Sequence, residues 1–138
     1  MLDKFDLFNC DLFGKCFMLC NKKNIDADDL FQKVMTSQWG KSTLNGNRFQ
    51  EWCCDTFMFE GFVKYLEPKN SPPKYDDFVL WFTGFLYKYW YETHKTKPED
   101  ILSLAPVSLI NKRFDFYHTQ SWDYIIEDLM GRQSLEKQ

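Results

Sequence analysis

Hydrophobic residues are most concentrated between positions 78 and 91, where the sequence reads FVLWFTGFLYKYWY. On a helix these side chains point in nearly every direction. A narrow polar strip runs through Asp77, Gly84, Lys88 and Lys95. A helix that is apolar almost all round belongs in the interior of a protein. The pattern therefore predicts a central aromatic helix over about residues 76–95.

The N-terminal part predicts two amphipathic helices. Over residues 3–21 apolar side chains recur every three or four positions, which places them on one helical face: Phe5, Phe8, Leu12, Cys16 and Cys20. A second helix is expected to begin after Asp26, a good N-cap, and to end near Ser37. Gly, Ser and Asn are frequent over residues 40–47, which predicts a loop there.

A third helix is predicted over about residues 48–66, and Pro68, Pro72 and Pro73 then enforce an extended connection. The letters GKST at 40–43 resemble the end of a phosphate-binding loop. However, Met35 stands where the motif needs its first glycine, and no strand is predicted before it. A nucleotide-binding P-loop is therefore excluded.

Short elements are predicted after the central helix. Thr96 and Glu99 have the spacing of a capping box for a short helix, and another short turn follows Pro106. Residues 114–117 are expected to be irregular. Ser121 should cap a last helix that ends at Gly131.

Together these elements predict an all-α fold, namely a compact single-domain bundle of five to seven helices around the central helix. The domain is expected to cover residues 1–131, and 132–138 is expected to be a polar tail. The chain has 138 residues, of which 44% are hydrophobic and 19% aromatic. This composition supports one well-packed core and argues against intrinsic disorder.

The charge pattern narrows the function classes. The net charge is −3, with 17 basic and 20 acidic residues intermixed. No basic stripe is present, so nucleic-acid binding is not expected. The longest apolar run is too short for a transmembrane helix, and no signal-peptide pattern is seen. We therefore expect a cytoplasmic protein without membrane attachment.

The sequence predicts neither a catalytic site nor a metal or cofactor site. Its cysteines, at 10, 16, 20, 53 and 54, include no C-x-x-C pair and are expected to be reduced and buried. Cys53 or Cys54 with His94 or His118 would supply a nucleophile and a base, but no spacing supports such a pair.

Two sets of candidate functional residues follow. A domain of this size cannot easily bury all its aromatic rings, and exposed rings often mark protein interfaces. The candidates for contact with a partner are Trp39, Trp52, Phe59, Lys88 and Tyr91. In the alternative, a ligand pocket lies between the central and last helices. Its candidate residues are Tyr87, Lys88, His118 and Thr119.

Several segments in this order resemble one family of proteins. The segments are Met35-Thr36-Ser37, GFLYKYW at 84–90, Ala105-Pro106, His118-Thr119 and Ile126-Glu127. They resemble a family of small all-helical bacterial proteins with a G-Y-L-Y-R-Y-W-like core helix and an H-T-x-D ending. That family is associated with toxin–antitoxin and immunity gene neighbourhoods, including toxins similar to ADP-ribosyltransferases.

The resemblance covers about residues 34–129, with two departures. Lys88 replaces an arginine and so loses its planar fork, and Ser121 replaces an aspartate that is an equally good N-cap. The resemblance implies an antitoxin or immunity protein that binds a cognate toxin. The alternatives are a small-ligand-binding or enzymatic protein and a self-associating subunit, so a homo-oligomer is left open.

Overall fold

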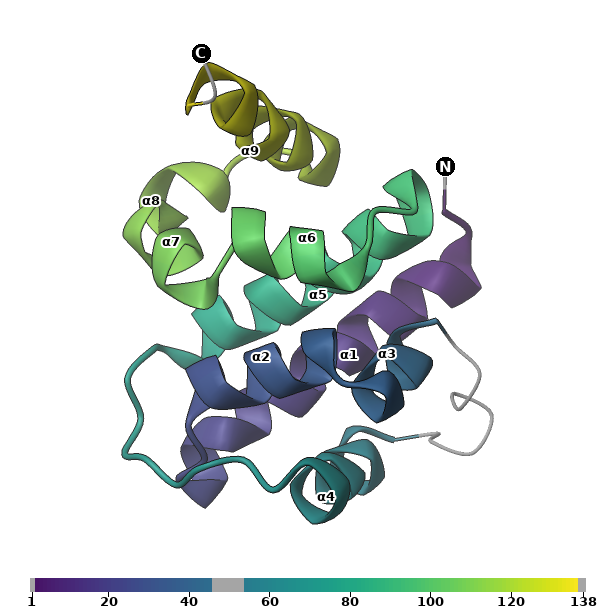
Figure 1. The fold of residues 1–138 in the computed structure, drawn as a ribbon, viewed down its shortest axis with the longest axis vertical. Coiled ribbons are helices and arrows are strands. Elements are labelled where there is room, and N and C mark those ends of the chain that lie inside the picture. The colour runs from purple at the N-terminus through teal and green to yellow at the C-terminus, as the bar shows by residue number, and fades with distance from the viewer. Residues whose placement is uncertain (1, 46–53, 137–138) are drawn as a thin grey trace.

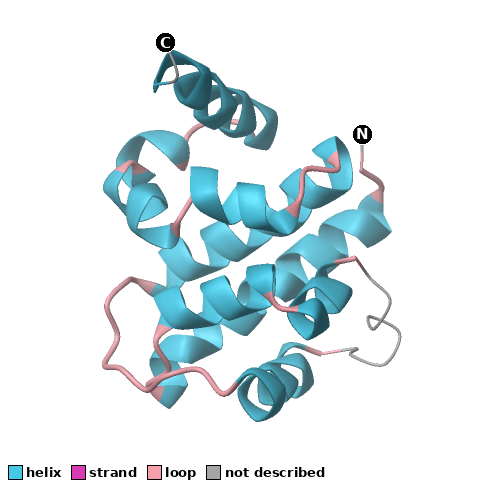
Figure 2. Cartoon of the chain, viewed as in Figure 1, coloured by secondary structure: helices cyan, strands magenta, loops and turns pink. Residues whose placement is uncertain are grey.

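The computed structural model describes residues 2–45 and 54–136, and these ranges contain helices and loops but no strand (Figures 1 and 2). The predicted all-α class is confirmed. The helices are α1 (Lys4–Lys23), α2 (Ala27–Thr36), α3 (Gln38–Leu44), α4 (Asp55–Leu66), α5 (Asp77–His94), α6 (Pro98–Leu104), α7 (Val107–Lys112), α8 (Phe114–Tyr117) and α9 (Trp122–Glu136).

Helix α5 is the predicted central helix, and its observed bounds lie within one residue of the expected ones. It runs antiparallel to α1, with Asn21 near the start of α5 and Gly14 beside Gly84. Helices α6 and α7 pack against another side of α5, which Phe31 of α2 also reaches through Tyr87 (Figure 1). Between residues 79 and 88, every α5 side chain except that of Trp81 is buried.

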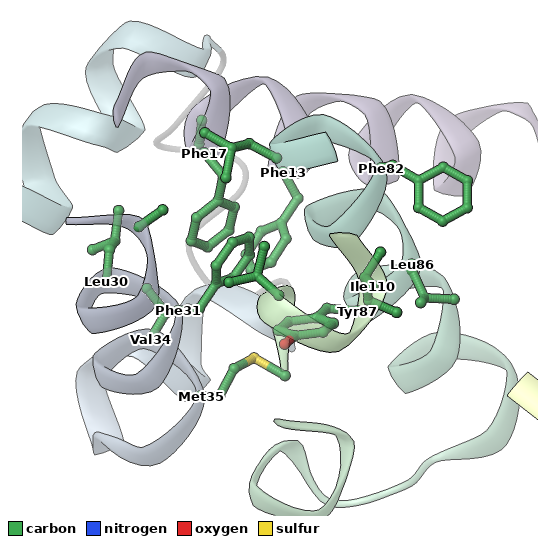
Figure 3. Close-up of a cluster of buried hydrophobic side chains, with 14 of the residues drawn as sticks. Phe13, Phe17, Leu30, Phe31, Val34, Met35, Phe82, Leu86, Tyr87 and Ile110 are labelled. Atoms are coloured by element: carbon green, nitrogen blue, oxygen red, sulfur yellow. The ribbon is translucent and has the colours of Figure 1, made fainter. Parts of the chain in front are cut away.

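The core is dense in aromatic rings where α1, α2 and α5 meet (Figure 3). Phe17 of α1 stacks on Phe31 of α2, with ring centroids 3.9 Å apart. Phe31 in turn meets the edge of Tyr87 of α5 at 5.1 Å. The Tyr87 hydroxyl donates a hydrogen bond to the carbonyl of Ala105, so its polar atom is satisfied inside the core.

Helix α3 corrects the predicted loop at residues 40–44, while 46 and 47 lie outside the described ranges. Ser37 ends α2 and also caps α3, because its hydroxyl accepts a hydrogen bond from the Gly40 amide at 3.0 Å. A Cβ on Gly40 would lie 2.3 Å from the Val34 carbonyl oxygen. The glycine is therefore needed for the sharp turn between two helices, rather than for a loop.

The start of α4 also departs from the prediction of a helix over 48–66. Cys54 is extended and α4 begins at Asp55, while residues 48–53 lie outside the described ranges. The Asp26 cap is confirmed by its bond from the Asp29 amide, and the Ser121 cap by its bond from the Tyr124 amide.

Three predictions for the C-terminal part were wrong. The capping box fails because the Thr96 hydroxyl accepts the Trp90 indole N–H instead, and α6 begins at Pro98 after Lys97. Residues 114–117 form the single helical turn α8. Helix α9 continues past Gly131 to Glu136, so 132–136 belongs to the helix and not to a tail. Within the described ranges there are nine helical segments rather than five to seven, because α3 and α8 form where a loop and an irregular segment were predicted.

The contact between α1 and α5 makes Gly84 a sensitive position. A Cβ there would lie 2.9 Å from both the Gly14 Cα and the Phe17 ring. We expect Gly84→Ala to lower the free energy of unfolding by about 1–3 kcal/mol, because it forces the helices apart. Urea denaturation measures this change.

Gly131→Ala is the matched control, since Gly131 is also inside a helix and a Cβ there has no neighbour within 4 Å. It should stabilise the protein by about 0.5–1 kcal/mol through helix propensity alone. Equal effects of the two substitutions would contradict close packing at Gly84.

Candidate functional site

One side of α5 presents a continuous stripe of aromatic rings. Phe78, Trp81, Phe85 and Tyr89 are spaced three or four residues apart and so share a helical face. This face lies roughly opposite Tyr87, which points toward α2 and the end of α6. Phe78 and Trp81 stack at 5.4 Å, and Trp81 meets Phe85 at 5.2 Å.

Trp122, the first residue of α9, lies against this stripe. Its ring stacks on Phe85 with centroids 4.5 Å apart and planes at 16°. It also contacts Trp81 and Tyr89, each at 6.3 Å. Ser121 directly precedes Trp122 and caps α9, so the start of the helix fixes the position of the indole.

Helix α8 extends the ring system toward the start of α5. The Phe114 ring meets the edge of Phe78 at 5.5 Å and that of Phe82 at 5.2 Å. His118 stacks on Phe114 at 5.4 Å, and its Nδ1 lies 2.8 Å from the Phe114 carbonyl oxygen. We call this surface the aromatic face: Phe78, Trp81, Tyr89, Phe114, His118 and Trp122, with Phe85 as its floor.

The aromatic face is partly exposed to solvent. Phe78 is 54% exposed, and Phe85 beneath Trp122 is 8% exposed. His118 is exposed, while Trp81, Tyr89, Phe114 and Trp122 are half-buried. The rings are therefore anchored by one another and still offer area to a partner.

Carboxylates from four helices border the aromatic face. Asp11 of α1 accepts the Trp81 indole N–H at 2.8 Å, and Asp123 of α9 accepts the Tyr89 hydroxyl at 3.1 Å. Asp77 and Asp115 directly precede and follow the face residues Phe78 and Phe114 in sequence, and both are exposed. We call these four residues the acidic rim. Burial, and then the bond to Asp123, raises the pKa of the Tyr89 hydroxyl.

Lys88 does not reach the surface, which corrects its assignment as a partner contact. Its residue is 2% exposed. The ammonium donates hydrogen bonds to the Leu44 carbonyl and, at 2.7 Å, to Glu92. Burial lowers the pKa of Lys88, and the Glu92 carboxylate opposes that shift. Lys88 thus ties the end of α3 to α5.

The four pocket candidates do not come together. Tyr87 bonds to Ala105, Lys88 bonds to Leu44, and His118 lies on Phe114. The hydroxyl of Thr119 donates to the Phe116 carbonyl. Because Tyr87 and Lys88 are buried against elements other than α8, the predicted shared pocket is not formed.

The remaining residues predicted to contact a partner differ in their exposure to solvent. Phe59 is 4% exposed and belongs to the core, so its assignment was wrong. Trp39 is half-buried between Phe62 and Tyr65. Tyr91 is half-buried beneath Lys95, and Trp52 lies outside the described residues.

Sequence reasoning missed Phe78, Phe114 and Trp122 as surface residues. The spacing at 78, 81, 85 and 89 contained the signal for the α5 stripe. The placement of Trp122 and Phe114 did not, because it depends on how α8 and α9 fold back onto α5. The Trp122 ring covers Phe85, while part of it meets solvent.

Three of the four cysteines in the described ranges are buried in the core, and Cys54 departs from the expected burial. Cys10, Cys16 and Cys20 are fully buried. Burial raises the pKa of Cys10 and Cys20 to about 12 and that of Cys16 well above its usual value. Cys54 is exposed, and Cys53 lies outside these ranges. In the same ranges no three His, Cys, Asp or Glu side chains are grouped to hold a metal ion.

No protein family, curated protein or solved structure matches this chain. The resemblance to antitoxin-associated proteins therefore stays a prediction. Among the described helices, none combines the length and apolar character needed to cross a bilayer.

Thiol burial predicts selective alkylation. At pH 8 iodoacetamide should modify Cys54, because only an accessible thiolate reacts readily. Cys10, Cys16 and Cys20 should stay unmodified until the protein is denatured. Peptide mass spectrometry reads each site, and rapid native labelling of Cys16 would contradict the packing of α1 against α4.

The buried ammonium predicts unequal roles for two lysines that share one carboxylate. Lys88→Met should lower the free energy of unfolding by about 1–3 kcal/mol, since it leaves the Leu44 carbonyl without its donor. Lys95 lies 3.6 Å from Glu92, but its side chain is 71% exposed. Lys95→Met should cost less than about 0.5 kcal/mol. Urea denaturation measures the free energy of unfolding of both variants. A loss for Lys88→Met as small as that for Lys95→Met would show that Lys88 has no structural role.

Proposed function

We propose that this chain is a non-catalytic protein-binding module, an antitoxin or immunity protein that neutralises a cognate toxin by direct binding. The supporting observation is the aromatic face, where rings from α5, α8 and α9 form one partly exposed surface. Large aromatic side chains dominate the binding energy of protein interfaces. Soluble domains rarely expose such a cluster without a partner.

The construction of the face favours binding over mere exposure. Trp122 is stacked on Phe85, and Phe114 is held between Phe82 and His118. Rings that are already fixed lose little conformational freedom when a partner covers them. The Trp81 and Tyr89 polar atoms keep their bonds to Asp11 and Asp123, so covering the rings need not leave them unpaired.

Neutralisation by this module would be steric. The toxin would bind with part of its surface against the aromatic face. Helices α1, α8 and α9 would then block access to that part of the toxin, and the acidic rim would lie at the edge of the contact. An apolar centre with a polar border is the usual anatomy of a specific interface. The mechanism requires no cofactor.

The enzymatic alternative receives less support. A groove of about 280 Å³ between α2 and α6–α7 includes Asp28, Phe31 and Leu102. This volume is slightly below the roughly 300–1,000 Å³ of small-molecule sites, and more open grooves of about 370 and 440 Å³ occur elsewhere. Asp28 in the first groove accepts the Tyr75 hydroxyl at 3.0 Å, which explains this carboxylate structurally. The residues proposed for a pocket near Lys88 and His118 are separated.

A substitution at the edge of the face tests the proposal. The probe is the product of the adjacent gene, co-expressed with this chain. Phe78→Ala should weaken the complex by about 2 kcal/mol, or roughly 30-fold, and reduce protection from that product. Calorimetry measures the affinity and growth measures the protection.

Tyr65→Ala is the matched control, because Tyr65 on α4 is 55% exposed and Phe78 is 54% exposed. The control should leave affinity and protection unchanged. A chain that neither binds nor protects against the adjacent gene product would refute the antitoxin role. Loss of binding with Tyr65→Ala and not with Phe78→Ala would place the interface on α4.

A further inference from the structure

We infer that the partner surface recognised by the aromatic face is cationic, with arginine or lysine side chains around an apolar patch. This inference rests on the proposed function and specifies the partner's chemistry. It follows from the charges that border the rings, which come from separate helices and have one predominant sign.

Three rim carboxylates are positioned by a hydrogen bond, whereas Asp115 belongs to the rim as the sequence neighbour of Phe114. Asp11 and Asp123 hold the polar atoms of Trp81 and Tyr89, at 2.8 and 3.1 Å. Asp77 accepts a hydrogen bond from the side-chain amide of Asn21 at 2.8 Å. Asp115 lies beside Phe114 in α8 and is exposed. Asp11 and Asp123 thus touch the face from α1 and α9, and Asp77 and Asp115 adjoin face residues in sequence on α5 and α8.

Arg113 directly precedes Phe114 in sequence, and within the described ranges Lys15 is a basic side chain in contact with the rim, 3.0 Å from Asp11. It neutralises one carboxylate of the rim. The other three carboxylates outnumber Arg113 beside the partly exposed rings. An arginine at the edge of the face would meet both a carboxylate and the face of a ring, and the two attractions would add.

The same charges disfavour two other occupants. A second copy of this chain would bring one acidic rim against another across a twofold axis, and like charges in an interface are repulsive. An acidic partner would meet the same repulsion. Charge complementarity therefore selects a basic protein surface.

Two synthetic peptides test the inference. One is an amphipathic helix of leucine and arginine, and the other carries glutamate in place of each arginine. Binding is followed by the fluorescence of the face tryptophans Trp81 and Trp122. The arginine peptide should bind at least 10-fold more tightly than the glutamate peptide. Its affinity should fall as salt rises, because screening acts over about 10 Å at 0.1 M.

Neutralising the rim gives the decisive comparison. The double variant Asp115→Asn, Asp123→Asn should weaken binding of the arginine peptide at least 5-fold. The control double variant Glu60→Gln, Asp100→Asn changes net charge equally, at exposed positions on α4 and α6. It should have less than a 2-fold effect. Equal effects of the two doubles, or equal binding of the two peptides, would overturn the inference.

The complex with the adjacent gene product separates the two proposals. If Phe78→Ala weakens that complex while the rim double variant does not, the proposed function stands and the cationic partner is refuted. If neither changes it, the aromatic face is not the interface. Light scattering that shows a dimer lost on Phe78→Ala would replace the cationic partner with a second copy of the chain.

Discussion

The close approach of α1 and α5 at Gly14 and Gly84 is the contact on which the remaining architecture depends. A Cβ on Gly14 would lie 2.6 Å from the Trp81 carbonyl oxygen, and one on Gly84 would lie 2.9 Å from the Gly14 Cα. On the same helix, Phe13 and Phe17 contact the rings of Phe62 in α4 and Phe31 in α2. One side of α5 therefore packs against α1, and another side faces α2, α6 and α7.

The aromatic face results from this arrangement. After α1, α2, α6 and α7 have packed around α5, a stripe from Phe78 to Tyr89 is left, and the short α8 and the start of α9 cover it incompletely. The core therefore continues outward into a surface through ring-on-ring contacts. This continuity makes the surface rigid, and rigidity distinguishes a docking surface from a scatter of exposed rings.

Much of the fold could be predicted from local patterns, because they depend on one helix at a time. The all-round apolar stretch at 78–91 predicted the central helix, and the caps at Asp26 and Ser121 predicted two helix starts. The predictions failed where one residue serves two elements. Thr96 has the spacing of a capping box but bonds to Trp90, and Gly40 belongs to a loop by composition but lets α3 turn against Val34. The site was the least predictable part, since burial decides it: Lys88 and Phe59 are internal, and Trp122 is half outside.

The pairing of α1 with α5 also has a consequence for synthesis on the ribosome. The apolar side of α1 is complete when the first 23 residues have emerged, but α5 ends at His94. At about 5–20 residues per second, several seconds pass before its partner exists. During that interval Phe13 and Phe17 lack their native cover, so the nascent chain is most vulnerable to aggregation until α5 has emerged.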